Sequence, residues 1–138
     1  MTKVLVFGTF DGLHPGHLDF LESAAKLGDS LVVSVAQDAI VERLKRRPAV
    51  RDLETRMIDL ALLPMVTEVM AGDLEIGTYH GLQRVKPDLI ALGYDQTELG
   101  RDLQRFQQAT GDETRVVVLK PYQPETYKSS LLRGPQLV

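Results

Sequence analysis

Short apolar runs alternate with longer amphipathic segments along the chain. Five of the runs are predicted as strands, at Val4–Phe7, Leu31–Ala36, Val66–Met70, Leu89–Leu92 and Val116–Leu119. Each run is short and nearly continuous in apolar character, which is typical of strands that are covered on both faces of a parallel sheet. The pattern therefore predicts a parallel sheet whose two faces are both covered.

The segments between these runs have helical spacing. Four helices are predicted, over His17–Leu27, Asp52–Leu63, about Leu74–Val85 and about Leu99–Ala109. Asp52 suits the N-cap of the second helix, because its side-chain oxygen accepts from backbone N–H groups that have no helical partner. Pro64 follows that helix and would end it.

Strands and helices in this alternation indicate an α/β fold. Right-handed crossovers then give a Rossmann-like, doubly wound sheet of five parallel strands. In such sheets, ligands bind beyond the carboxyl ends of the strands, where the strand order reverses. The chain shows no internal repeat, low-complexity tract or linker, so we expect residues 1–138 to form a single domain.

Composition narrows the class of protein. The 138 residues are 43% hydrophobic, with a net charge of −3, no cysteine and no tryptophan. The charge and the scarcity of aromatic residues argue against nucleic-acid binding. No apolar run approaches the roughly 18 residues of a membrane span, and the N-terminal segment lacks the features of a signal peptide. We expect a cytoplasmic protein without disulfides and with no nucleic-acid or membrane partner.

The most informative motif follows the first predicted strand. It reads Gly-Thr-Phe-Asp-Gly-Leu-His-Pro-Gly-His, from Gly8 to His17. Pro15 suits a first helical turn, and Gly16 lets a ligand approach the backbone closely. A helix N-terminus attracts anions, and histidines there can donate to the same phosphate. Two of the three histidines lie here, so we favour a phosphate site over capping histidines; the third, His80, is expected at the surface.

A second motif, Gly93-Tyr94-Asp95-Gln96, comes directly after the fourth predicted strand. It is compatible with an ordinary polar turn between a strand and a helix. It is also compatible with a nucleotide site, because glycine admits a base or ribose and Asp95 accepts hydrogen bonds. In combination with the histidine motif, the nucleotide interpretation is favoured.

Basic and hydroxyl residues form two further candidate anion sites. Lys45-Arg46-Arg47-Pro48, with Arg51 and Arg56 nearby, is either a solvated face at a helix end or part of a phosphate site. Near the C-terminus, Ser129 and Ser130 can cap a helix, and Arg133 lies three residues after Ser130, so both can face one anion.

The histidine motif, with Ala24-x-x-Leu27-Gly28-Asp29 after it, resembles the signature of the cytidylyltransferase-like nucleotidylyltransferases. The resemblance covers essentially the whole chain. Members of this family join a nucleoside monophosphate from ATP or CTP to an acceptor phosphate and release pyrophosphate. The resemblance also implies the strand order 3-2-1-4-5. Homodimers are frequent in the family, so a homodimer is compatible with it, although the sequence identifies no interface.

The resemblance also implies roles for individual residues. His14 and His17 would bind phosphates and stabilise the transition state, and Arg56 and Lys45 would approach the triphosphate or the acceptor phosphate. Asp11 would orient the loop or approach a magnesium ion. Further nucleotide contacts are implied at Gly8, Thr9, Phe10, Pro15, Gly16, Gly93, Asp95, Gln96, Tyr122, Ser129, Ser130 and Arg133.

The second motif suggests the substrates. Gly93-x-Asp95-Gln96 is similar to an element of the small archaeal-type FAD synthases, which adenylate FMN. This implies transfer from ATP to FMN with Mg²⁺, giving FAD and pyrophosphate. The alternative is a CTP-dependent enzyme acting on glycerol 3-phosphate or a related polyol phosphate. A catalytically idle nucleotide-binding module would not need the full set of residues, and a dinucleotide oxidoreductase lacks its Gly-x-Gly-x-x-Gly motif.

Overall fold

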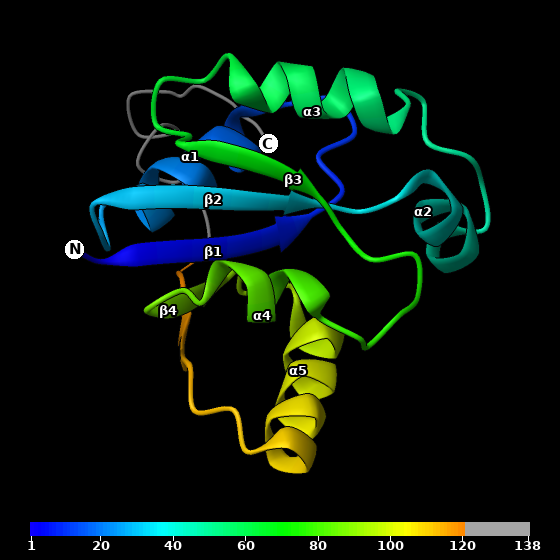
Figure 1. The fold of residues 1–138 in the computed structure, drawn as a ribbon. Coiled ribbons are helices and arrows are strands. Elements are labelled where there is room, and N and C mark those ends of the chain that lie inside the picture. The colour runs from blue at the N-terminus through cyan, green and yellow to red at the C-terminus, as the bar shows by residue number, and fades with distance from the viewer. Residues whose placement is uncertain (121–138) are drawn as a thin grey trace.

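The computed structural model describes residues 1–120 of the chain, and its centre is a five-stranded parallel sheet (Figure 1). The strands are β1 (Lys3–Gly8), β2 (Ser30–Val35), β3 (Glu68–Ala71), β4 (Leu89–Leu92) and β5 (Arg115–Val118). Their spatial order is β3-β2-β1-β4-β5. The predicted parallel sheet and its order are thus confirmed, with strand ends that differ from the predicted ones by two residues or fewer.

The helices are α1 (Pro15–Ala25), α2 (Asp38–Lys45), α3 (Leu53–Ala61), α4 (His80–Val85) and α5 (Thr97–Thr110). Three of them match predicted helices closely, and Asp52 caps α3 as expected, accepting from the backbone N–H of Thr55 at 2.9 Å. Helix α2 was not among the predicted helices.

Helix α4 is much shorter than the predicted segment Leu74–Val85. Gly77 and Tyr79 adopt left-handed backbone conformations, with φ of 87° and 49°, which interrupt the helical path. Asp73 holds the interrupted segment by accepting from the Thr78 hydroxyl and from the His80 backbone N–H. His80 itself is exposed, as expected.

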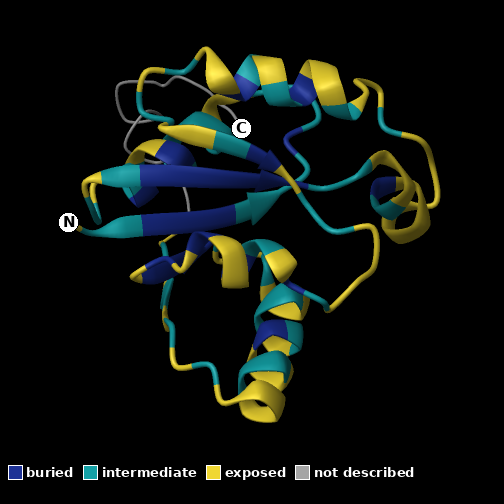
Figure 2. Cartoon of the chain, viewed as in Figure 1, coloured by how far each residue is buried: buried dark blue, intermediate teal, exposed yellow. Residues whose placement is uncertain are grey.

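Alternate residues of the strands enter two separate layers of the core. Val4 and Val6 of β1 pack with α1 and α3, whereas Leu5 between them packs with α4 and α5. The helices therefore cover both faces of the sheet, as Figure 1 shows. Figure 2 shows the central strands buried and the outer faces of the helices exposed. No helix in residues 1–120 has the length and apolar character needed to span a membrane.

The strand order reverses between β1 and β4, and this point positions the site. After β1 the chain enters a turn and then α1 on one face of the sheet, and after β4 it enters α5 on the other face. Both loops therefore open at the same edge of the sheet, where the arrowheads of β1 and β2 point in Figure 1.

Candidate active site

A cavity of about 790 Å³ opens at the carboxyl ends of β1 and β4. It brings together most residues that the sequence predicted for the site: Gly8, Thr9, Phe10, Asp11, His14, Gly16, His17, Lys45, Gly93, Asp95 and Gln96. Pro15 and Arg56 do not line it. Tyr122, Ser129, Ser130 and Arg133 lie outside the described residues 1–120.

His14 is the N-cap of α1. Its Nδ1 accepts hydrogen bonds from the backbone N–H groups of Gly16, at 3.1 Å, and His17, at 3.4 Å. A neutral imidazole that accepts at Nδ1 carries its proton on Nε2, so the ring retains one donor for a ligand. The motif predicted a phosphate site at this helix N-terminus; in the structure the N–H groups of Gly16 and His17 are bonded to His14.

The glycine between the two histidines is explained by this cap. A Cβ placed on Gly16 would lie 2.9 Å from Cε1 of His14. The His14 ring folds back over this position, so a side chain there would push the ring away from its cap. The glycine therefore serves the placement of His14 as well as close approach to a ligand.

His17 lies against His14 and is partly buried. The two rings are stacked, with centroids 3.6 Å apart, and Phe10 meets the His17 ring edge-on at 5.4 Å. The buried Nδ1 of His17 has no hydrogen-bond partner among the described residues. Burial, followed by the proximity of His14, lowers the pKa of His17 to about 4. His17 is therefore neutral at pH 7 before an anion binds.

Gln96 joins the end of β1 to the loop after β4, where the strand order reverses. Its amide Nε2 donates to the Phe7 carbonyl at the end of β1, and its Oε1 accepts from the Gly93 N–H after β4, both at 2.8 Å. The side chain was predicted as a nucleotide contact. The structure shows that its amide fixes the cavity floor by bonding to backbone on both neighbouring strands.

Both cations and carboxylates line the cavity wall. Lys45 and Arg47, at and after the end of α2, line it together with Lys120, which was not among the predicted site residues. Asp11 uses its two carboxylate oxygens to accept from the N–H groups of Val50 and Arg51, each at 2.8 Å. The Val50 hydrogen bond is the main cause that lowers the pKa of Asp11. Asp11 therefore orients the segment that follows Lys45–Pro48.

Arg56 does not reach the cavity, in contrast to the expectation that it contacts phosphate. Its side chain is fully buried. The guanidinium donates to the carbonyls of Thr9, Ala36 and Arg51 and to the carboxylate of Asp38, at 2.7–2.9 Å. These partners belong to the loops after β1 and β2 and to the starts of α2 and α3. Arg56 thus holds the loops that form the cavity, and we assign it a positioning role.

A histidine caps a helix at the point where the strand order of the parallel sheet reverses. This arrangement agrees with a match between the chain and a known protein family. Residues 5–134 match the family described as Cytidylyltransferase-like. The chain belongs to this family. The resemblance of the histidine motif is thereby confirmed.

Curated relatives of this cytidylyltransferase-like chain carry the name FAD synthase. The protein from Aciduliprofundum boonei is 40% identical over 88% of this chain and 80% of its own length. The protein from Thermococcus onnurineus is 45% identical over 99% of this chain and 88% of its own length.

Solved structures show the same fold. The crystal structure named lipopolysaccharide core biosynthesis protein, from Thermoplasma volcanium, has a TM-score of 0.80 and is 33% identical over 89% of this chain and 99% of that chain. Pantothenate synthetase from Thermus thermophilus has a TM-score of 0.60 at 22% identity, covering 92% of this chain and 58% of that chain. This second likeness concerns the fold alone.

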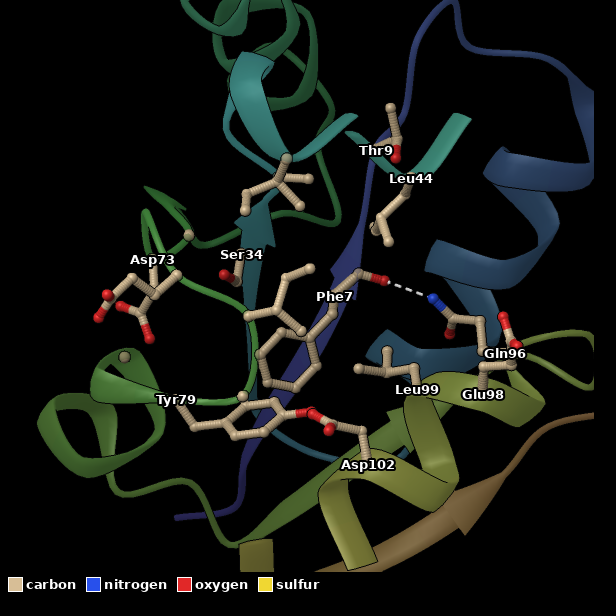
Figure 3. Close-up of a pocket in the computed structure, with 18 of the residues that line it drawn as sticks. Phe7, Thr9, Ser34, Leu44, Asp73, Tyr79, Gln96, Glu98, Leu99 and Asp102 are labelled. Atoms are coloured by element: carbon tan, nitrogen blue, oxygen red, sulfur yellow. Dashed lines mark hydrogen bonds between the residues drawn. The ribbon is translucent and has the colours of Figure 1, made fainter. Parts of the chain in front are cut away.

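The cytidylyltransferase-like chain has a second cavity, of about 480 Å³, beside the first (Figure 3). Phe7, Gly8, Thr9 and Gln96 line both cavities, so they meet along the end of β1. The remaining wall is largely apolar and includes Ile40, Leu44, Ile76, Tyr79 and Leu99.

Aromatic rings form the floor of this second cavity. Phe7 meets Tyr79 edge-on, with ring centroids 5.8 Å apart, and Phe106 packs against Tyr79 at 4.9 Å. The Tyr79 hydroxyl donates to Asp102 at 2.6 Å. No motif in the sequence predicted this cavity. The spacing of Leu99, Asp102 and Arg105, which places all three on one face of a helix, is the one sequence feature that relates to it.

Proposed function

We propose that the chain catalyses adenylyl transfer from ATP to FMN, giving FAD and pyrophosphate. The observation that carries the proposal is the pair of adjoining cavities at the end of β1. One is polar and lined by His14, His17 and Lys45; the other is apolar and floored by aromatic rings. A triphosphate suits the first cavity, and the fused apolar rings of a flavin suit the second. The relatives named FAD synthase support the same assignment.

The charges around the cavities favour one orientation of FMN. Asp73, Glu75, Glu98 and Asp102 line the apolar cavity, with Arg105 as its cation. A phosphate would be repelled there and attracted to the basic wall of the histidine cavity. The flavin ring therefore occupies the apolar cavity, and its phosphate extends across Gly8 and Thr9 toward the histidines.

The reaction then needs alignment more than proton abstraction. An anionic oxygen of the FMN phosphate attacks the α-phosphorus of ATP and forms a new P–O bond. The bond from that phosphorus to the α–β bridging oxygen breaks, and its electron pair leaves with pyrophosphate. His14 donates from Nε2 to the phosphates, while Lys45, Arg47 and Lys120 offset charge that moves toward the leaving group.

His17 is suited to a role in the transition state. It is neutral before binding because burial lowers its pKa to about 4. Phosphate charge beside the ring raises that pKa, so His17 becomes a stronger hydrogen-bond donor as negative charge accumulates. Asp95 and Gly93, on the β4 side, are proposed to contact the adenosine, and Gln96 to hold both loops in place.

Magnesium is proposed to enter with ATP, as the MgATP complex. Within residues 1–120, no group of three histidine or carboxylate side chains is arranged to hold a metal ion. Mg²⁺ in such reactions is bound by substrate phosphates with only one or two carboxylates from the protein. Asp11 lines the cavity and remains our candidate for this contact, although both its oxygens already accept backbone hydrogen bonds.

The alternative substrates, CTP and glycerol 3-phosphate, use the apolar cavity less well. A polyol phosphate has little apolar surface to bury against Leu44, Tyr79 and Leu99, so that cavity would contribute little affinity. A flavin ring gains affinity from the same walls. We also propose a cytoplasmic location, and the homodimer stays a prediction that size measurement in solution tests.

Direct assay of FAD tests this proposal. The full chain is incubated with MgCl₂ and each pairing of ATP or CTP with FMN or glycerol 3-phosphate, and FAD and pyrophosphate are quantified. We expect ATP with FMN to give FAD and pyrophosphate in equal amounts, and ATP to raise the melting temperature more than CTP does. Turnover of CTP with glycerol 3-phosphate alone would overturn the proposal, as would the absence of pyrophosphate from all four pairs.

A further inference from the structure

The carboxylate of Asp102 stands out in the wall of the apolar cavity. It comes from the middle of α5, and its side chain is 29% exposed. The Tyr79 hydroxyl donates to its Oδ2 at 2.6 Å, as the positions of the two labelled side chains in Figure 3 reflect. A partly buried carboxylate among apolar side chains needs donors, because its charge is otherwise poorly solvated.

Asp102 retains capacity to accept further hydrogen bonds. A carboxylate offers about four acceptor positions, and the Tyr79 hydroxyl occupies one. Arg105 approaches Oδ1 only to 3.7 Å, which is longer than a hydrogen bond. Gly77 faces the carboxylate without a side chain: a Cβ placed there would lie 3.6 Å from Oδ2. The carboxylate is thus held in place on one side and open on another.

The other carboxylates of this cavity are less suited to a ligand. Asp73 already accepts from the Thr78 hydroxyl and the His80 backbone N–H, so it is committed to its own loop. Glu75 and Glu98 are exposed residues. An exposed carboxylate gains little by exchanging water for a ligand donor. Asp102 is therefore the acceptor in this cavity that a buried donor would satisfy best.

The oxidised flavin ring has one N–H donor, at N3 of its imide. Resting on the proposed function, we propose that Asp102 determines acceptor specificity by accepting a hydrogen bond from this ring N–H. A site that is built to bond one polar group rejects an analogue that lacks it, because the buried partner is left unpaired. The apolar walls thus provide affinity for the ring, and Asp102 selects its imide edge.

Tyr79 acts as a positioning residue for this contact. Burial and the hydrogen bond to Asp102 raise the pKa of Tyr79, so its hydroxyl stays protonated and donates throughout the physiological pH range. Packing against Phe7 and Phe106 fixes the ring. Removing the hydroxyl alone would leave this packing and release the carboxylate.

Comparison of FMN with N3-methyl-FMN tests the proposal. The methyl group replaces the N–H donor and leaves the phosphate and the rest of the ring unchanged. We expect the wild-type chain to show a kcat/KM for FMN at least about 100-fold above that for N3-methyl-FMN. In Asp102→Ala, the value for FMN falls and that for N3-methyl-FMN changes little, so the ratio drops below about 5.

Two further variants distinguish recognition of the ring N–H by Asp102 from a general effect of losing a carboxylate or of destabilising the fold. Tyr79→Phe is expected to lower the ratio to an intermediate value. Glu113→Ala removes an exposed carboxylate outside both cavities and is expected to keep the full ratio. A wild-type ratio near one would overturn the role of Asp102, and this measurement needs no variant. Failure to form FAD from FMN itself would instead overturn the proposed function.

Discussion

The rings of His14 and His17 are stacked, with centroids 3.6 Å apart and planes inclined by 23°. One ring caps α1 through Nδ1, and the other is buried at Nδ1 without a partner among the described residues. The contact means that positive charge on one ring disfavours charge on the other, which contributes to the lowered pKa of His17. The two rings therefore differ in their hydrogen bonding before substrate binds: Nδ1 of His14 is used by the cap, and Nδ1 of His17 has no partner among residues 1–120.

Substitutions of His14 should separate its capping role from its role toward phosphate. Asparagine is a good N-cap, so His14→Asn is expected to keep the melting temperature near that of the wild type. It loses the Nε2 donor, and kcat is expected to fall by about 10²–10³. His14→Ala also loses the cap, at a further cost of about 0.5–2 kcal/mol in the free energy of unfolding. Equal stability of the two variants would contradict the capping role.

The stability of the ligand-free chain should depend on pH through His17. Its pKa is about 4 when folded, against an ordinary value of 6.5, so the unfolded chain binds more protons between these values. The free energy of unfolding is therefore expected to fall as pH decreases from 7 toward 4. His17→Gln should reduce this loss in urea titrations at pH 7, 6 and 5, whereas His80→Gln, at an exposed ring, should retain it. An identical decline in both variants would count against a buried neutral His17.

Substitution of Arg56 is expected to lower mainly the stability of the chain, whereas substitution of Lys45 is expected to lower mainly its activity. Arg56→Met leaves buried carbonyls without donors, and each such acceptor costs about 1–3 kcal/mol, so unfolding should occur at much lower urea. Lys45→Met removes an exposed cation from the cavity wall. It should leave stability within about 0.5 kcal/mol and lower kcat/KM about 10–100-fold. A stable Arg56→Met with low activity would instead support the phosphate contact that the sequence analysis predicted.

Gln96 offers a test of the link between β1 and β4. Gln96→Ala removes the bonds to Phe7 and Gly93 and is expected to lower the free energy of unfolding by about 1–3 kcal/mol. Gln96→Glu should be no better, because an oxygen then faces the Phe7 carbonyl. Gln104→Ala, on the exposed face of α5, is the control and should change stability by less than about 0.5 kcal/mol. Urea denaturation measures all three.

Local patterns were enough to predict the parallel sheet and to single out the histidine motif, whereas the strand order was implied by the family resemblance that this motif carries. Runs such as Val4–Phe7 carry their strand signal in adjacent residues, and the motif from Gly8 to His17 is continuous in sequence. The strand order and the family were confirmed. The roles of individual site residues stay predictions, which the variants above test.

What the sequence did not predict depends on contacts between distant segments. Nothing near Arg56 in the sequence shows that the Thr9 and Ala36 carbonyls converge on its guanidinium. The apolar cavity likewise depends on the non-helical segment before Tyr79. Asp73 stabilises that segment by accepting a hydrogen bond from the backbone N–H of His80. Such features arise only when the crossovers have placed the loops beside one another.

The shared wall at the end of β1 has a consequence for how such a protein can diversify. Phe7, Gly8, Thr9 and Gln96 belong to both cavities, whereas most of the remaining lining of each cavity comes from different segments, with α2 contributing Leu44 to one and Lys45 to the other. Exchange of residues around Tyr79 and Leu99 can therefore alter which acceptor is chosen while the histidines keep their positions. A substitution of Gly8, in contrast, alters the lining of both cavities and would therefore affect the binding of both substrates. The fold thus separates the evolution of substrate choice from that of the chemical step.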